Sequence, residues 1–263
     1  MQFDVVLPSV ISTIIVAIVE LYPRFQPRMK SIFEEKEFQI RDAFFLVIAM
    51  GAMVTAIVFV PQQAIQIMFL AAYSFVLFLF TYIAVEKWFI SVLPPLAFLA
   101  LYLSGFWNII LVNLFAIFFA VSIVVYLGGL FSWTTVLVFA ALIVAMDVIQ
   151  VLGTEFMGAA ADRFVELELP ILIQVPTYPV EGGIGLGLGD IFLAGLLAIQ
   201  SLSKYDRTAA VISAVSIGFA FFIYEVIAFS LRLFTYFPAT IIVVCGWLLS
   251  LGLYQLVTRR RSS

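Results

Sequence analysis

Two aspartates are embedded in apolar segments of this chain, and these residues are the best placed to carry chemistry. Asp147 follows the largely apolar run 133–146, and Asp190 lies between the glycine-rich stretch 182–189 and the apolar run 191–197. An ionised aspartate in the apolar layer of a membrane costs roughly 2.5–3.5 kcal/mol. Two such residues in consecutive apolar segments therefore indicate a function.

The chemistry that fits such a pair is acid–base hydrolysis. Two carboxylates in contact in a medium of low dielectric constant cannot both ionise easily, so they share a proton. The ionised member can deprotonate a water that attacks a peptide carbonyl, and the protonated member can donate to the developing oxyanion. This pattern predicts an aspartyl protease that needs neither a metal nor another cofactor.

The sequence contains no histidine, which removes most other hydrolytic sites. Ser-His and Cys-His nucleophilic catalysis and the His-Glu-x-x-His zinc sites all require that residue. The single cysteine, Cys245, forms no disulfide within the chain and is too few for a metal cluster. Carboxylates are thus the natural candidates for catalysis.

The composition indicates that lipid is the solvent for most of the chain. Hydrophobic residues make up 65% of it and charged residues 11%. A soluble domain of this size cannot cover so much apolar surface with polar side chains. A net charge of −3 and the lack of a basic patch give no indication of nucleic-acid binding.

Apolar runs about 20 residues long predict an all-α membrane protein with about nine transmembrane helices in a single domain, residues 1–263. The first run is expected to be a span rather than a cleaved signal, because it is long and lacks a positively charged start. The expected spans are 4–22, 42–60, 63–85, 88–104, 107–127, 132–153, 184–203, 208–231 and 237–257.

The spans fall into two groups, with spans 1–6 in residues 1–153 and spans 7–9 in residues 184–263. The loop between them, 154–183, contains Leu169–Tyr178, a β-branched and apolar stretch bracketed by prolines. It is too short for a span, and its composition favours an extended strand. The other long connection, Tyr22–Arg41, is expected to be a solvated loop with room for an interfacial helix.

The predicted depths of the two aspartates match. Asp147 lies about six residues before the end of its span and Asp190 about six residues after the start of the next, or roughly 9 Å inside each. Consecutive spans run antiparallel, so both carboxylates are expected at one depth below the same membrane face. Gln150 shares a helical face with Asp147, and is expected either to bond within the bundle or to orient the pair.

Glycines precede Asp190 at alternate positions, 185, 187 and 189. A residue without a Cβ lets a second backbone approach closely, as a peptide substrate must beside the catalytic base. The alternative is that these small residues pack helices together in the membrane.

The segment Gly187-Leu188-Gly189-Asp190 resembles the Gly-x-Gly-Asp motif of the presenilin and signal peptide peptidase family. That family carries its partner aspartate in a Tyr-Asp pair on an earlier span, and a later span begins with Pro-Ala-Leu. The corresponding residues here are Met146-Asp147 and Pro238-Ala239-Thr240. The order of the motifs matches along essentially the whole chain, and the lack of long loops is similar to the compact archaeal members.

The resemblance implies a presenilin-like bundle that cleaves transmembrane or signal-peptide substrates within the bilayer. Asp147 and Asp190 would be catalytic. Substrate contacts are expected from the residues of both motifs and from the predicted strand. These are Gly187, Leu188, Gly189, Pro238, Ala239, Thr240, Ile171 and Ile173. The departures at Met146 and Thr240 remove a hydroxyl and a leucine contact, respectively, and the oligomeric state is left open.

Three other functions fit parts of the pattern. Paired intramembrane acids also serve ion- or proton-coupled transporters, although the sequence has no internal repeat. Prepilin-type peptidases also use Gly-x-Gly-Asp, but the Pro238-Ala239-Thr240 segment favours the presenilin-like branch. A noncatalytic scaffold is the third alternative. Glu225 and Arg232 share a helical face and are expected to form a structural ion pair or to reach the interface.

Charge bias predicts the orientation. With nine spans, one side collects most of the Lys and Arg residues, and the other collects only Arg163 and Arg232. Because short cytoplasmic loops are rich in Lys and Arg, the crowded side should be cytoplasmic. This arrangement places the C-terminus inside, and the N-terminus and the 154–183 loop outside, of a multi-pass protein in the cell membrane.

Overall fold

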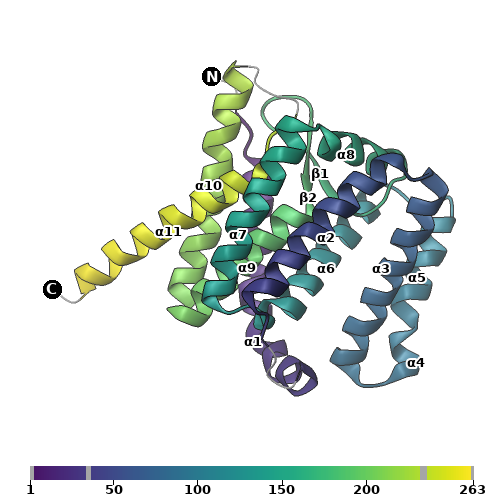
Figure 1. Ribbon diagram of the computed structural model, residues 1–263, viewed down its shortest axis with the longest axis horizontal. Coiled ribbons are helices and arrows are strands. Elements are labelled where there is room, and N and C mark those ends of the chain that lie inside the picture. Colours follow the sequence, from purple (N-terminus) through teal and green to yellow (C-terminus); the bar gives the residue numbers. More distant parts are fainter. Residues whose placement is uncertain (1–2, 34–36, 232–235, 262–263) are drawn as a thin grey trace.

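The chain folds into a bundle of helices with one short hairpin of strands (Figure 1). The computed structural model describes residues 3–33, 37–231 and 236–261. The helices are α1 (Val6–Phe33), α2 (Ile40–Phe59), α3 (Gln62–Val85), α4 (Trp88–Ser91), α5 (Leu93–Leu103), α6 (Ile109–Leu127), α7 (Trp133–Val148), α8 (Phe156–Glu166), α9 (Leu188–Lys204), α10 (Arg207–Leu231) and α11 (Ala239–Arg261). Single turns η1 (Gly128–Leu130) and η2 (Ile149–Gly153) flank α7, and the strands are β1 (Leu172–Pro176) and β2 (Gly183–Gly187).

The expected class, an all-α membrane protein, is confirmed. Among the described residues, 7 helices are long and apolar enough to cross a membrane. They are α1, α2, α3, α6, α7, α10 and α11. The pair α4–α5, over Trp88–Leu103, and the 17-residue α9 are shorter, so the count of nine is not confirmed.

Large apolar side chains cover the outside of the bundle, as lipid contact requires. Phe45 on α2 is 66% exposed, Phe75 on α3 is 62% exposed, and Leu248 on α11 is 55% exposed. Soluble monomers rarely show apolar patches of this extent. The structure is thus consistent with a multi-pass protein whose outer surface faces hydrocarbon.

Helix α9 forms the centre of the bundle. Every residue from Ile191 to Ser201 is buried, and α1, α6, α7, α10 and α11 all contact this helix. A helix that is apolar on all sides must be enclosed by protein or lipid, and here protein encloses it. The position of Asp190 is fixed because it lies in the first turn of this enclosed helix.

Small residues allow the helices around α9 to approach closely. A Cβ on Gly218 of α10 would lie 2.7 Å from the carbonyl oxygen of Pro8 on α1. A Cβ on Gly246 of α11 would lie 2.7 Å from the Cα of Ile217 on α10. Small residues at crossings of this kind are the usual way to pack helices in membranes.

The hairpin and α8 lie together at one end of the bundle, at the top in Figure 1, which we call the hairpin end. The N-terminus also lies at this end, because the backbone N–H of Val5 donates to Tyr178, just beyond β1 (3.0 Å). Helix α11 starts there and runs to the opposite end, where the Tyr254 hydroxyl donates to Asp206 in the turn before α10 (3.0 Å).

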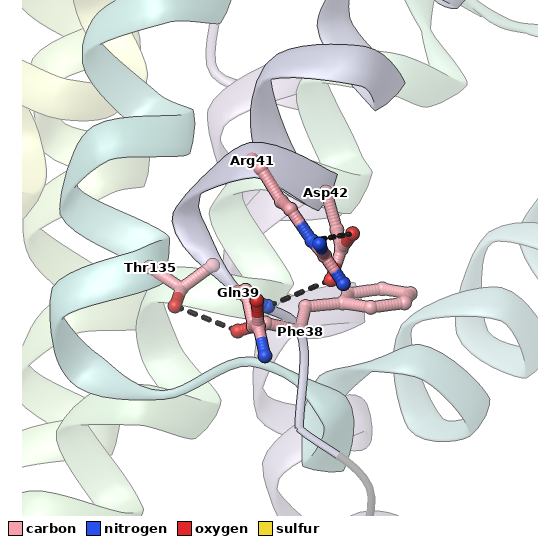
Figure 2. A network of polar contacts seen from close by, with 5 residues as sticks. All are labelled: Phe38, Gln39, Arg41, Asp42 and Thr135. Atoms are coloured by element: carbon pink, nitrogen blue, oxygen red, sulfur yellow. Dashed lines mark hydrogen bonds and ion pairs between the residues drawn. The ribbon is translucent and has the colours of Figure 1, made fainter.

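The opposite end is held by the start of α2, which Figure 2 shows. The Thr135 hydroxyl of α7 donates to the carbonyl oxygen of Phe38 (2.9 Å), and the Phe38 N–H donates to Leu130 (2.7 Å). Asp42 accepts from the Gln39 N–H (2.9 Å) and so caps the helix. These contacts align α2 parallel to α7, the helix that carries Asp147.

Three segments differ from the sequence-based expectation. The expected fourth span is divided into α4 and α5 because Pro94 and Pro95 occupy the first turn of α5, where proline starts a helix. Helix α1 continues through Pro23 and Pro27 to Phe33, so much of the expected solvated loop is helical. The loop 154–183 contains α8, which was not predicted.

The predicted start of the seventh span at residue 184 is also wrong. Residues Gly183–Gly187 form β2, and the helix starts at Leu188. The segment with the alternating glycines is extended here because it pairs with β1, the strand predicted within Leu169–Tyr178. The boundary between loop and span therefore moves from residue 183 to residue 187.

Candidate active site

Asp147 and Asp190 lie at the ends of two antiparallel helices, α7 and α9. Asp147 is the penultimate residue of α7 and is 5% exposed, and Asp190 is the third residue of α9 and is half-buried. The predicted depth of about six residues inside each span was wrong for Asp190, because α9 starts later than expected. The two carboxylates still lie at a similar level, since both line the same cavity.

The two carboxylates meet in one cavity and interact electrostatically. The cavity has a volume of about 1050 Å³ and opens among α2, α7, α8, both strands, α9, α10 and α11. Its walls are mostly apolar, as is usual for a binding site with a few placed polar groups. It is large enough to hold a segment of polypeptide beside the pair.

Thr240 binds Asp147 directly, through two donors. Its hydroxyl donates to Oδ2 of Asp147 at 2.6 Å, and its backbone N–H lies 3.4 Å from the same oxygen. That N–H belongs to the first turn of α11, where amides have no partner within the helix and the helix dipole favours a negative charge. The carboxylate of Asp147 therefore lies at the N-terminus of α11 and accepts hydrogen bonds from its first turn.

Asp190 occupies a similar place at the start of α9. Gly187 is the N-cap residue of this helix, and its backbone amide faces the Asp190 carboxylate. A Cβ on Gly187 would lie 3.2 Å from Oδ2 of Asp190, tighter than ordinary contact. Glycine at this position thus leaves room for the carboxylate, whereas Gly189 has open space beside it and lines the cavity.

Backbone pairing in the hairpin leaves one strand edge open. The N–H of Leu188 donates to Ile171 and that of Thr177 to Gly182 (3.0 and 3.1 Å), which fixes the alternation of the antiparallel ladder. In such a ladder, every second residue turns its N–H and C=O away from the partner strand. On β2 these residues are Gly183, Gly185 and Gly187, and all three line the cavity.

The outer edge of β1 is closed by Asn113 of α6. Its side-chain amide donates to the carbonyl of Gln174 (2.6 Å) and accepts from the N–H of the same residue (2.8 Å). Asn113 was missed in the sequence, although it is a lone amide in the apolar run Ile109–Leu127. The available edge is therefore that of β2 and not that of the predicted strand.

The remaining predicted contact residues divide into two sets. The cavity is lined by Ile171, Leu188, Ala239 and Thr240, together with the two motif glycines. Ile173 is 1% exposed and packs in the main core, so its expected contact with substrate is not supported. Pro238 is buried just before α11 and does not line the cavity. Its contribution is to start the helix that carries Thr240.

Gln150 and Met146 contact α2 on the far side of Asp147. The Gln150 side chain donates to the carbonyl of Gly51 (2.8 Å), as expected for a bond within the bundle. A Cβ on Gly51 would lie 2.9 Å from the sulfur of Met146, so this glycine makes room for the Met146 side chain. These contacts fix the last turn of α7, where η2 replaces regular helical bonding.

Helix α8 is tied to two neighbours at the hairpin end. Arg163 donates to the carbonyl oxygens of Ile57 and Val60 (2.8 and 2.7 Å) at the end of α2. Asp162 accepts from the Tyr236 hydroxyl in the segment before α11. That bond, together with partial burial, raises the pKa of Tyr236 to about 12. Because Asp162 and Tyr236 line the cavity, α8 forms part of its wall.

No protein-family model matches the chain, and no curated protein sequence matches it. The geometry of the site and the residues of the motifs therefore carry the functional proposal.

The Thr240 hydroxyl yields the first prediction. Thr240→Val keeps the shape of the side chain but removes the donor to Asp147. It should lower kcat for the peptide cleavage that the sequence predicts about 10- to 100-fold, with little change in KM. Thr240→Ser, which restores a hydroxyl, should recover most of the rate. Steady-state kinetics on a transmembrane peptide measures both. Equal rates for the valine and serine variants would contradict a role for this hydroxyl.

Proposed function

We propose that the protein is an intramembrane aspartyl protease of the presenilin and signal peptide peptidase type, with Asp147 and Asp190 as its catalytic residues. The observation that carries the proposal is the shared cavity, in which two interacting carboxylates lie beside a strand with an open backbone edge. The first feature suits hydrolysis by activated water, and the second suits an extended peptide.

In the proposed reaction the carboxylates have different protonation states. Asp147, which accepts from Thr240, is the ionised member and removes a proton from a water molecule. The water oxygen attacks the peptide carbonyl carbon, while the proton of Asp190 passes to the carbonyl oxygen. The C–N bond of the tetrahedral intermediate then breaks as the nitrogen takes the proton held by Asp147, and the second hydroxyl returns a proton to Asp190.

The open edge of β2 provides a reason for its alternating glycines. A transmembrane helix hides its carbonyl groups in its own hydrogen bonds, so the scissile segment must unwind before attack. The outward N–H and C=O groups of Gly183 and Gly185 can pair with the unwound segment. Gly187 follows on the same edge and adjoins Asp190, so pairing along β2 would bring the peptide to the catalytic dyad, Asp147 and Asp190.

This backbone edge also favours the protease over a transporter. A coupled transporter binds its ion with carboxylates and carbonyl groups, but it has no need for a strand edge beside them. The Pro238-Ala239-Thr240 segment favours the presenilin-like branch over prepilin-type peptidases, since it starts α11 at the carboxylate of Asp147. The substrate class proposed is accordingly a transmembrane segment or a signal peptide in a lipid bilayer.

The proposed orientation has the hairpin end outside the cell and the opposite end in the cytoplasm. Among the described side chains, the basic residues at the opposite end are Arg24, Arg41, Lys87, Lys204 and Arg207, whereas Arg163 is at the hairpin end. Lys and Arg favour the cytoplasmic side. This assignment compares the basic residues at the two ends of the bundle, so it does not depend on the number of spans.

The catalytic pair is tested by two single substitutions. Asp147→Asn and Asp190→Asn should each abolish cleavage of a transmembrane peptide, because the reaction needs one acid and one base. Asp42→Asn, at the opposite end of the bundle (Figure 2), is the matched control and should keep the wild-type rate. Mass spectrometry of the products and the thermal stability in detergent are measured together. Cleavage above background by either folded variant would refute the assignment.

The strand edge is tested at Gly185, which is exposed and where an added Cβ would meet nothing closer than 4.0 Å. Gly185→Pro removes the outward N–H and should reduce kcat/KM at least about tenfold, the loss expected for a hydrogen bond of roughly 1.4 kcal/mol. Gly185→Ala keeps that N–H and should retain most of the activity. Kinetics on one peptide compares the pair. A proline variant as active as the alanine variant would exclude pairing at this residue.

Orientation is tested by labelling of cysteines in intact cells. With Cys245 replaced by serine, a cysteine at position 181 should react with a membrane-impermeant reagent, whereas one at position 206 should react only after permeabilisation. Labelling in the reverse pattern would place the cavity towards the cytoplasm. The polarity of the substrate in the membrane would then be reversed as well.

A further inference from the structure

Glu225 on α10 is a further acidic residue of the cavity, and the proposed reaction does not use it. Its side chain is 1% exposed and lines the cavity with Leu7, Phe221 and Tyr224. Neither carboxyl oxygen has a hydrogen-bond partner among the described residues. Arg232, the partner expected from the sequence, lies outside the described residues. A buried carboxyl group without a partner is costly and therefore indicates a function.

Asp4 increases the negative potential at this place. It is fully buried before α1 and interacts electrostatically with Glu225. Its carboxylate accepts the N–H groups of Val6 (3.1 Å), Leu7 (3.0 Å) and Tyr178 (2.7 Å). Three backbone donors at the start of α1 hold the Asp4 carboxylate in place. Among the described residues, Glu225 is thus the member of the pair without a hydrogen-bond partner, and Asp4 is held in place behind it.

The contacts of Asp4 also locate Glu225 relative to the strands. Asp4 binds the N–H of Tyr178, two residues beyond the end of β1, whereas the dyad adjoins the other end of the hairpin at Gly187. Leu172, the partner of Gly187, is six residues before Tyr178, or roughly 20 Å of extended chain. A peptide paired with β2 would therefore have its scissile bond at the dyad and a residue several positions away near Glu225.

We infer that Glu225, with Asp4 behind it, forms a subsite for a cationic side chain of the substrate, lysine or arginine, a few residues from the scissile bond. The inference rests on the proposed protease function and adds a sequence preference to it. A cation entering an apolar cavity needs an anionic partner, and a carboxylate with no other hydrogen bond is available for it. The apolar stem of lysine or arginine suits the walls formed by Leu7 and Phe221.

The test compares peptides that differ in one charge. N-acetylated transmembrane peptides carry either lysine or norleucine at each position within eight residues of the cleavage site, on both sides. Wild-type protein should cleave the lysine peptide about tenfold faster in kcat/KM at one or two neighbouring positions on one side. Glu225→Gln, which keeps the shape but not the charge, should reduce that ratio to about one. Glu181→Gln, an exposed acid between the strands that does not line the cavity, should keep it.

A binding measurement separates this inference from the proposed function. The Asp190→Asn variant, with and without Glu225→Gln, is titrated with the fluorescently labelled lysine and norleucine peptides. Loss of about tenfold in affinity for the lysine peptide alone would support the subsite even if no cleavage were found. Equal rates and affinities for lysine and norleucine at all positions, or a lysine preference that survives in Glu225→Gln, would overturn it.

Discussion

The hairpin end of the bundle is organised around the cost of keeping carboxylates in an apolar interior. For each member of the dyad, the N-terminus of a helix offsets part of the cost of burying the carboxylate. This helix is α11 for Asp147 and α9 for Asp190, and its backbone amides and dipole favour negative charge. Asp4 is held in the same way at the start of α1. Three helices thus begin next to an acid, which explains why the functional groups gather at one end of the molecule.

A second constraint acts on the backbone of the hairpin. Peptide groups away from water must find partners, so an extended segment within a membrane protein is stable only where other groups bind it or where it borders a cavity. The ladder satisfies β1 on one side, and Asn113 binds the outward groups of Gln174 on the other. The outward groups of β2 instead face the cavity. The segment of the bundle with spare hydrogen-bonding capacity is therefore the one beside the dyad.

The sequence predicts this arrangement where a single residue type determines the result. Aspartates within apolar runs are rare and costly, so Asp147 and Asp190 could be picked out without a structure, and their matched depth followed from antiparallel helices. The start of α9 could not be predicted, because alternating glycine and apolar residues suit a packed helix as well as a strand. Only pairing with β1 decides between them. The bond from Thr240 to Asp147 joins residues 93 positions apart and depends on the placement of α11.

Enclosure of α9 has a consequence for the assembly of the protein during synthesis. Its covering helices come from both directions in the chain, with α1, α6 and α7 made before it and α10 and α11 made after it. When α9 leaves the ribosome, only part of its surface has a partner, and lipid or the insertion machinery must shield the rest. At this stage Asp190 lacks the neighbours from α10 and α11 that complete the cavity. The bundle closes, and Asp147 receives Thr240, only when the last helix has been inserted.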